Sequence, residues 1–505
     1  MLPFAILLSL AGTYLLFDAR PGINWGIWAT LLAIGVVAAQ WSQYGRVGRV
    51  TAGLALLGAA FAWGIAVTAN EALTVISIAA AFVAFSHAVL AMPDVGTRQL
   101  TVGRLALGPI EAPVRGIAES GRQVQEALVA ARREEALPVL RGAGIALPVV
   151  AVFALALSTA DPVFAAWRDR AADSLDHLPV ARVAFALVLF VASLGALGLA
   201  ARARQRAAVI PLMFAPTGFR LGFTERLIPI ASAVALFACF LVLQVSYLFG
   251  NAPAVEGSGI TFAEYARRGF VELTFVAAAC GALLVLLRGG KEHPGDARVL
   301  RVLELVLIAE LALLLASAFR RIVLYEEAYG FTMARVWGQA FMLTLAAGLL
   351  VLGRELAGAF DVHRLVRRQA ALGAAMLLAL TYWNHEAWIA RRNVERFDRS
   401  GQLDLGYLAE GLSANGVPAA LQAARRAGGE RGICADLRIR RRWAGVLERR
   451  AWYEWNAAVP PVRSALSAPL WYTLSTTERS RLLAGGCAAV ESTEAKAQPQ
   501  ATGTV

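Results

Sequence analysis

The stretch ELVLIAELALLLASAFRRIVLYEEAYG, residues 304–330, decides the fold class of this chain. It is apolar and long enough to cross a bilayer as a helix, which takes about 20 residues. It nevertheless carries Glu304 and Glu310 in its apolar part, and the pair Arg320 and Arg321 further on. Because carboxylates are costly in hydrocarbon, a spanning helix of this composition must turn them toward other helices. The stretch therefore predicts one member of a transmembrane helix bundle.

The composition of the whole chain supports the same class. Apolar residues make up 58% of the 505 residues and charged residues only 17%, which is too little polar surface for a soluble fold of this size. The apolar runs are continuous and do not alternate with polar residues, so they indicate helices and not the strands of a barrel. We predict an all-α, polytopic transmembrane helix bundle with a small helical extracytoplasmic C-terminal domain.

The apolar runs divide the chain into about eleven predicted spans. The spans are residues 3–18, 24–41, 51–68, 72–91, 142–159, 179–200, 227–249, 266–288, 302–324, 332–352 and 369–385. The predicted domains are N-terminal transmembrane helices (1–92), a cytoplasmic loop with an amphipathic interfacial helix (93–141), a transmembrane core (142–385), an extracytoplasmic helical domain (386–490) and a disordered tail (491–505).

The placement of arginine predicts the orientation of the chain. Arg46 and Arg49 follow the second predicted span, and several arginines between Arg98 and Arg133 follow the fourth, whereas the loop with Asp161 after the fifth is acidic. Loops rich in arginine stay in the cytoplasm, so we expect the N-terminus inside and the C-terminal domain outside. The net charge of +12 lies mainly between apolar runs, and we therefore predict no nucleic-acid partner.

The region 109–137 has a helical period and is not apolar enough to span. Its apolar residues recur at steps of three and four: Ile110, Val114, Ile117, Val124 and Leu128. This pattern predicts an amphipathic helix on the cytoplasmic face, packed on lipid or on the bundle. A helix that binds a partner protein is the alternative.

Charged residues within the predicted spans leave two hypotheses open. In the first, spans seven to nine enclose a polar cavity. There Glu272 and Glu310 would bind an ion or substrate, Arg268 and Arg321 would clamp an anion, and Gln244 would add a polar atom. In the second, these charges are structural pairs that hold the helices together. The sequence favours the second hypothesis, because paired charges near helix ends are common.

The C-terminal region carries turn signals and cysteines but no catalytic motif. The run SANGVP predicts a cap at Ser413 and a helix that opens near Pro418. Cys434 and Cys487 are candidates for a disulfide if this region lies in an oxidising compartment. His385 and Glu386 are adjacent, and neighbouring residues diverge on a helix, so they make a poor metal pair. The sequence predicts no metal site and no cofactor.

Five motifs occur in order and together resemble one family. They are LALSTADPVFA, LVLQVSYLFG, GITFAEYARRGFVEL, ASAFRRIVLYEEAYGFTMARVW and IARRNVERFDRSGQLDLGYLAEGLSANGVPAAL. They are similar to bacterial polytopic membrane proteins grouped as domain of unknown function forty-one seventy-three and its close sister family. The resemblance runs from about residue 140 to 425. It implies many helices and a bacterial cytoplasmic (inner) membrane location, and it implies no reaction.

Three classes of function fit these observations. The favoured interpretation is a non-catalytic membrane component, such as a scaffold, sensor or assembly factor. Its lipid-embedded bundle would carry an outer domain (386–490) that meets an envelope or membrane protein partner. The first alternative is a transporter of an ion or anionic small solute that uses Glu272 and Glu310. The second is a membrane-embedded enzyme that acts on lipid or envelope polymer, with Asp161 as its candidate acid.

Overall fold

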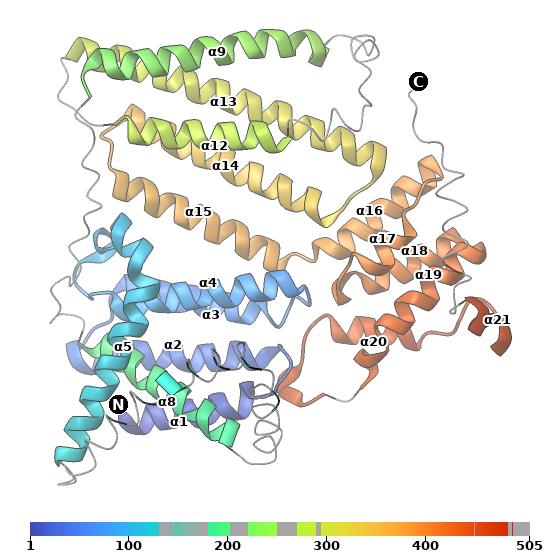
Figure 1. The fold of residues 1–505 in the computed structure, drawn as a ribbon, viewed down its shortest axis with the longest axis horizontal. Helices are drawn as coiled ribbons and strands as arrows, with labels where there is room; N and C mark the ends of the chain where they lie inside the picture. The colour runs from blue at the N-terminus through green and yellow to red at the C-terminus, as the bar shows by residue number, and fades with distance from the viewer. Residues whose placement is uncertain are drawn as a thin grey trace. The chain divides into compact units, whose positions relative to one another are not determined.

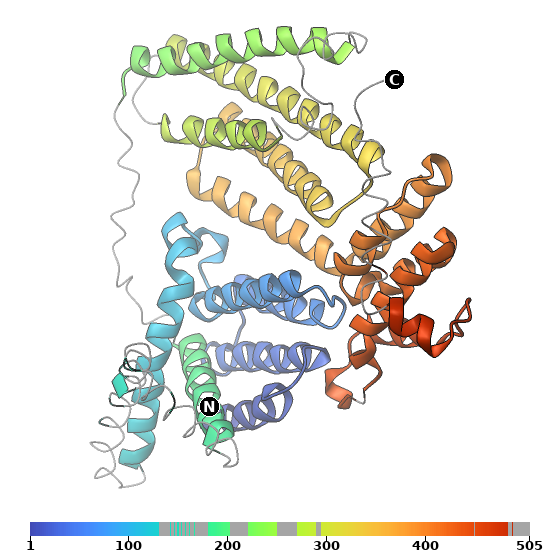
Figure 2. The same cartoon turned by 45° about the vertical axis from the view of Figure 1, so that its right-hand side comes forward.

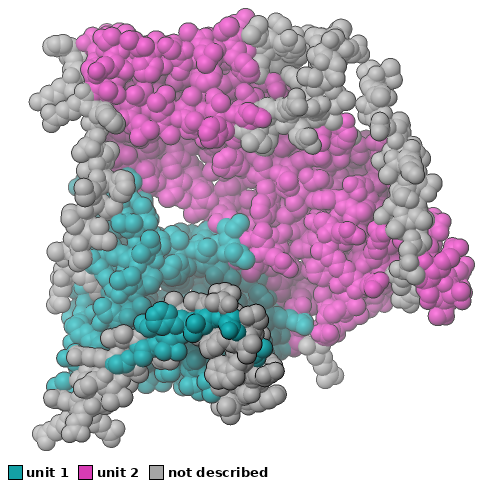
Figure 3. All heavy atoms as spheres, in the orientation of Figure 1, with its two compact units in different colours: residues 1–66, 75–211, 451–455 teal, residues 67–74, 212–450, 456–505 magenta. Residues whose placement is uncertain are grey.

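The fold is built of helices, and the residues described contain no strand. The computed structural model describes residues 1–130, 180–202, 221–249, 270–288, 294–448 and 450–482, Cys487, and scattered positions between 142 and 166 (Figure 1). The chain forms two compact units, coloured in Figure 3. Unit 1 comprises residues 1–66, 75–211 and 451–455, and unit 2 comprises residues 67–74, 212–450 and 456–505. The predicted disordered tail, 491–505, lies outside the described residues.

Unit 1 is a bundle of apolar helices. Its helices are α1 (Leu2–Leu16), α2 (Ile23–Tyr44), α3 (Arg49–Gly64), most of α4 (Glu71–Leu90), the 3₁₀ turn η1 (Gly96–Gln99), α5 (Val102–Ala130), α8 (Val180–Ala201) and the short turn η5 (Trp452–Glu454). Apolar side chains of α1, α2 and α8 form its core, with Leu8, Val36 and Leu194 fully buried. The amide of Asn24 closes the turn between α1 and α2, because its Nδ2 donates to Leu15 O over 2.9 Å.

Helix α5 is amphipathic and runs across one end of α2, α3 and α4 in both Figure 1 and Figure 2. It contains the helix predicted within 109–137, begins earlier at Val102, and is described as far as Ala130. Its small residues face α8, where the backbones of Gly116 and Gly195 approach closely: a Cβ on Gly195 would lie 2.5 Å from Gly116 O. The large apolar residues Ile110 and Ile117 point away and are 65% and 66% exposed.

The transmembrane part of unit 2 centres on one long helix. Its helices are α9 (Phe223–Phe249), α12 (Phe270–Leu286), α13 (Pro294–Tyr329), α14 (Met333–Ala357) and α15 (Val362–Tyr382). Helix α13 packs against α9, α12 and α14, and it buries Leu307, Leu311 and Leu314 completely. This fits the prediction that the stretch 304–330 lies within a helix bundle.

The C-terminal helices of unit 2 lie at the end of α13, α14 and α15 where α13 finishes and α14 begins (Figure 1). They are α16 (His385–Ser400), α17 (Leu405–Glu410), η3 (Ala414–Gly416), α18 (Val417–Ala427), α19 (Gly429–Arg442), η4 (Ala444–Leu447), α20 (Val459–Ser467) and α21 (Thr476–Arg481). Ser413 caps η3 and Pro418 stands in the first turn of α18, as the sequence predicts. Buried residues of α16 to α20 form a core of their own.

Six helices in the described part of the chain are long and apolar enough to cross a membrane. They are α2, α4, α8, residues 223–242 of α9, residues 295–327 of α13, and α14. Within the described residues, the other predicted spans do not reach that length and hydropathy. At 15 residues, α1 rises only about 22 Å, short of a hydrocarbon core of about 30 Å, and α3 and α12 are also short. The first turns of α15 carry three arginines, and the predicted span 142–159 lies outside the described ranges. A multi-helix membrane protein is supported, and eleven spans are not confirmed.

The close approach of α5 and α8 predicts different effects for two glycine substitutions. Gly195→Ala places a methyl group against the backbone of Gly116, so we expect a loss of about 1–3 kcal/mol in the free energy of unfolding. Gly121→Ala on α5 meets open space and should leave stability unchanged or slightly higher. Thermal unfolding of the full chain in detergent measures both. Equal melting temperatures for the two variants would contradict the described packing.

Candidate functional site

The residues predicted to bind a ligand within the membrane differ in how deeply they are buried. Glu310 is 8% exposed, and its Oε2 has no hydrogen-bond partner among the described residues. Glu272 lies in the first turn of α12 at an exposed position, and Arg321 is half-buried on α13. The side chains of Arg268 and Gln244 lie outside the described residues. The hypothesis of a shared polar cavity therefore stays a prediction.

Glu304 belongs to a buried ion cluster at the N-terminal end of α13. Arg226 Nη2 lies 3.5 Å from one carboxylate oxygen of Glu304, and Arg288 Nη2 lies 3.3 Å from the other. Arg226 and Glu304 are both 1% exposed. A buried carboxylate requires such partners, because removing one would leave an uncompensated charge. The cluster ties α9, α13 and the end of α12 together.

A second carboxylate is paired at the same end of the unit 2 helices, at the turn from α14 to α15. Glu355 is 1% exposed and accepts from Arg364 Nη2 over 2.6 Å and from Arg368 Nη1 over 2.5 Å. Asp361 caps α15 by accepting from the backbone N–H groups of His363 and Arg364. These hydrogen bonds, from Arg364 N above all, hold the pKa of Asp361 below its ordinary value.

The opposite end of the unit 2 helices carries hydrogen bonds of a different kind, which involve backbone. At the turn between α13 and α14, Asn393 of α16 brackets Phe331: its Oδ1 accepts from Phe331 N and its Nδ2 donates to Phe331 O, each over 2.8 Å. Tyr407 Oη accepts from Met333 N over 2.7 Å. Gly330 has φ +82° in this turn, and a Cβ there would lie 2.6 Å from Asn393 Oδ1.

The loop between α3 and α4 is held by the same group of helices. Glu386 Oε1 accepts from Asn70 Nδ2 over 2.7 Å, and its Oε2 accepts from Ser413 N over 2.6 Å. Asn415 accepts from Ala69 N and donates to Val67 O. Both oxygens of a 1% exposed carboxylate are therefore used to join a loop and a cap.

His385 completes this group, and both of its ring nitrogens are engaged. Trp337 Nε1 donates to His385 Nε2 over 3.1 Å, and since an indole N–H can only donate, Nε2 is the acceptor nitrogen. The proton of the neutral ring is then on Nδ1, which lies 3.0 Å from Trp383 O. We call Asn393, Tyr407, His385, Glu386 and Asn415 the clasp. Each of its side chains makes at least one hydrogen bond to another described residue.

A small hollow lies beside the clasp. Residues of the α3–α4 loop, the end of α15, the start of α16 and η3 line it: Val67, Thr68, Thr381, Trp383, Asn384, His385, Glu386 and Asn415. Its empty volume is about 220 Å³, and it has room for about one water molecule. Pockets for small-molecule ligands are usually about 300–1,000 Å³, so the hollow suits a bridging water and not a substrate.

The sequence did not point to the clasp as a unit. His385 and Glu386 were considered only as a metal pair, and the structure directs them to different partners. The residues they meet stand far along the chain, 48 residues away for Trp337 and 316 for Asn70. A run of polar residues directly after a span was the one available signal.

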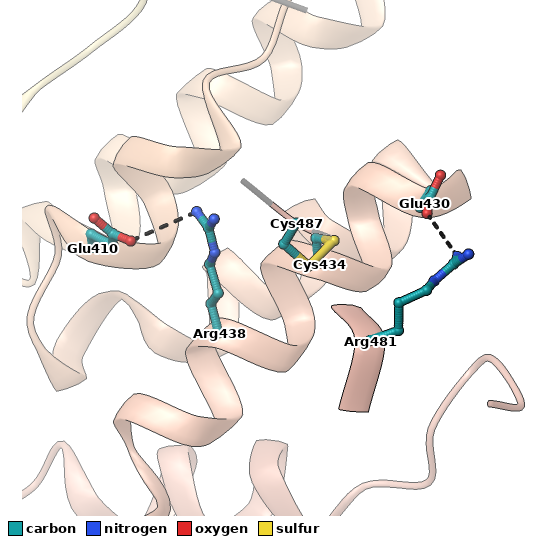
Figure 4. The surroundings of a disulfide bond; sticks show 6 residues. All are labelled: Glu410, Glu430, Cys434, Arg438, Arg481 and Cys487. Atoms are coloured by element: carbon teal, nitrogen blue, oxygen red, sulfur yellow. Dashed lines mark ion pairs between the residues drawn. A yellow bond between two sulfur atoms is a disulfide. The ribbon is translucent and has the colours of Figure 1, made fainter. Parts of the chain in front are cut away.

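The C-terminal helices also contain a disulfide between Cys434 of α19 and Cys487 (Figure 4). The two Cα atoms are 5.5 Å apart, and the sulfurs are buried beside Leu437 and Leu482. Ion pairs between Arg438 and Glu410 and between Arg481 and Glu430 flank it, each at 3.7 Å. The bond ties the chain after α21 to α19.

The fold and site describe a membrane protein of many helices whose C-terminal helices are fastened to the helix connections. The sequence matches the family described as domain of unknown function DUF4153 over residues 4–423, and the chain belongs to this family. The clasp lies inside the matched range and the disulfide outside it. The motifs had indicated family forty-one seventy-three and its sister, and neither is confirmed. Comparisons with curated proteins and with solved structures gave no match.

The clasp predicts that a single amide holds the α13–α14 turn. Asn393→Ala leaves the N–H and C=O of Phe331 without their partners, and each buried unsatisfied group costs about 1–3 kcal/mol. We expect a lower melting temperature in detergent and faster proteolysis in the turn. Gln422→Ala, an exposed polar truncation on α18, is the matched control and should change neither. An Asn393→Ala protein as stable and protease-resistant as that control would show that the amide is dispensable.

Proposed function

We propose that this protein is a non-catalytic component of a bacterial cytoplasmic membrane, a scaffold or assembly factor that presents its C-terminal helices to a partner at the outer face. The clasp is the observation that carries this proposal. Asn393 and Tyr407 form hydrogen bonds with the α13–α14 turn. Glu386 and Asn415 form hydrogen bonds with the α3–α4 loop. Buried hydrogen bonds to two connections fix the orientation of a domain, which a binding platform needs and a flexible tether would not provide.

The distribution of charge along unit 2 supports the outer location. Arg226, Arg288, Arg364 and Arg368 gather at the end of the helices where α13 begins. The C-terminal helices lie at the other end, where α13 finishes. Arginine-rich ends of spans stay in the cytoplasm, so this arrangement favours a C-terminal domain outside. The disulfide fits an oxidising outer compartment, where such bonds persist.

The composition of the C-terminal domain indicates the chemistry of the partner. Residues 386–490 contain sixteen arginines and ten acidic residues. Arg441 and Arg442 are exposed at the end of α19, and Leu447, five residues later in the chain, is 48% exposed. Basic residues together with an exposed apolar residue suit a protein partner with an acidic surface.

A transporter is the second candidate, and one observation favours it. Glu310 is a buried carboxylate with an oxygen that has no hydrogen-bond partner among the described residues. Ionisable residues at membrane depth are often ligands for ions or protons. In this hypothesis Glu310 and Glu272 bind the transported solute, and the C-terminal domain plays a secondary role in the function.

Orientation is tested by labelling two cysteines introduced at exposed polar positions of opposite predicted sides. In a background with Cys239 and Cys280 replaced by serine, Gln422→Cys on α18 should react with an impermeant maleimide in intact spheroplasts. Gln125→Cys on α5 should react only after lysis. The native pair Cys434 and Cys487 should resist labelling until reduced. The reverse labelling pattern would overturn the outer location.

The partner is tested with a photoreactive amino acid at the exposed position Leu447 in living cells. We expect one discrete crosslinked species, and its yield should fall several-fold when Glu386→Ala releases both the loop and the cap of η3. Glu310→Gln at equal abundance is the control, and a scaffold should tolerate it. Loss of the species with Glu310→Gln, but not with Glu386→Ala, would contradict the scaffold and favour the transporter.

A further inference from the structure

Two arginines lie beside the turn between α13 and α14. Arg335 Nη1 donates to Gly330 O. Arg396 of α16 donates from Nε to Glu327 O over 2.9 Å, and its Nη1 would lie 3.8 Å from a Cβ placed on Gly330. Both guanidinium groups therefore lie within a few ångströms of the same glycine, although 61 positions separate them in the chain. The clasp side chain Asn393 makes two hydrogen bonds to Phe331 in the same turn.

The two arginines bring positive charge to the turn, close to the buried carboxyl of Glu326. Arg335 is the third residue of α14, where the partial positive charge of the helix N-terminus adds to that of the guanidinium. Burial and then the charge of Arg335 lower the pKa of Arg396, which is the direction expected for two adjacent cations. The buried carboxyl of Glu326 accepts from Gln339 over 2.7 Å, and neither guanidinium donates to it. Positive charge thus gathers at this turn.

Arg335 keeps most of its hydrogen-bonding capacity. A guanidinium has five N–H donors, and within the described residues that of Arg335 makes one hydrogen bond, to Gly330, and no ion pair. Its Cζ lies 4.2 Å from the centre of the Tyr325 ring, which holds the planar group in position. Arg335 is half-buried, so its remaining donors stay within reach of a ligand. The arginine is positioned, charged and only partly used.

The turn stands where a membrane-spanning helix finishes. The part of α13 that is long and apolar enough to cross a membrane runs as far as Glu327, and Gly330 follows three residues later. The rings of Tyr325 and Tyr329 contact each other in a tilted arrangement with their centroids 4.7 Å apart, and Tyr329 is 41% exposed. Tyrosines are typical of the layer of lipid headgroups, where phosphate is the abundant anion.

From this geometry we propose that Arg335 and Arg396 form a binding site for a phosphate group, supplied by the headgroup of an anionic lipid. Arginine binds phosphate through two parallel N–H donors, and Arg335 has those donors available. Arg396, whose described bonds go to Glu327 O and to Gln402, contributes mainly charge. A bound headgroup would neutralise the pair and anchor the α13–α14 turn, and with it the clasp, to the lipid surface.

The test is native mass spectrometry of the full chain in neutral detergent, titrated with phosphatidylglycerol or phosphatidylcholine. We expect Arg335→Gln to weaken phosphatidylglycerol binding by about tenfold or more, because a charge-assisted hydrogen bond is lost. Arg335→Lys should weaken it less, since lysine keeps the charge without the planar fork. Arg425→Gln removes an equal charge from an exposed position on α18 and should bind as the wild type does.

Inorganic phosphate separates the two sources of the ligand. If millimolar phosphate raises the melting temperature of the wild type but not of Arg335→Gln, while lipid binding is equal in all variants, the anion site stands and its ligand is soluble. Equal binding of lipid and of phosphate by the wild type, Arg335→Gln and Arg335→Lys would overturn the proposal. If Arg335→Gln does not fold, the comparison of Arg335→Lys with Arg425→Gln decides in the same way.

Discussion

Hydrogen bonds from a few buried polar side chains to backbone groups of helix connections are the interaction on which unit 2 depends. The helices themselves satisfy their own backbone, and apolar packing between them is largely non-directional. Directional bonds are needed where helices end. Asn393 makes two of them with Phe331, and Glu386 accepts one from Ser413 N and a further bond from the side chain of Asn70. Together with the bonds of Tyr407, Asn415 and Arg396, these bonds define the orientation of the C-terminal helices.

The two ends of the unit 2 helices are held by different kinds of interaction. Where α13 begins, carboxylates meet arginines in ion pairs, as Glu355 does with Arg364 and Arg368. Where α13 finishes, amides and a carboxylate bond to backbone, and arginines such as Arg396 bond to carbonyl oxygens. Ion pairs hold helix to helix, and backbone bonds hold a domain to a turn.

The sequence predicted the features that depend on local pattern. Continuous apolar runs found α2, α4, α8 and α14 as spanning helices, and three- and four-residue periodicity found the later part of α5. The capping residue Ser413 and the first-turn Pro418 located the start of α18. Each of these signals lies within one or two helical turns, so no knowledge of distant residues was needed.

The sequence could not predict what depends on distant partners. Glu304 was not singled out as needing an interior partner, because its partners Arg226 and Arg288 come from α9 and from the end of α12. Glu386 stood out only as a neighbour of His385, because the partner Asn70 is 316 residues away. The number of spans could not be predicted from hydropathy either. Hydropathy detects the apolar run of α1, but it does not show that this helix has only 15 residues, which are too few to cross the membrane.

The length of α13 has a mechanical consequence. Its 36 residues rise about 54 Å, against a hydrocarbon thickness of about 30 Å. A helix this much too long for its bilayer leans away from the membrane normal or carries its end clear of the acyl chains. The turn that follows it is fastened to the C-terminal helices, so any change in lean is passed to them as a change of angle. Bilayers of different thickness would therefore change the angle between the C-terminal helices and the membrane.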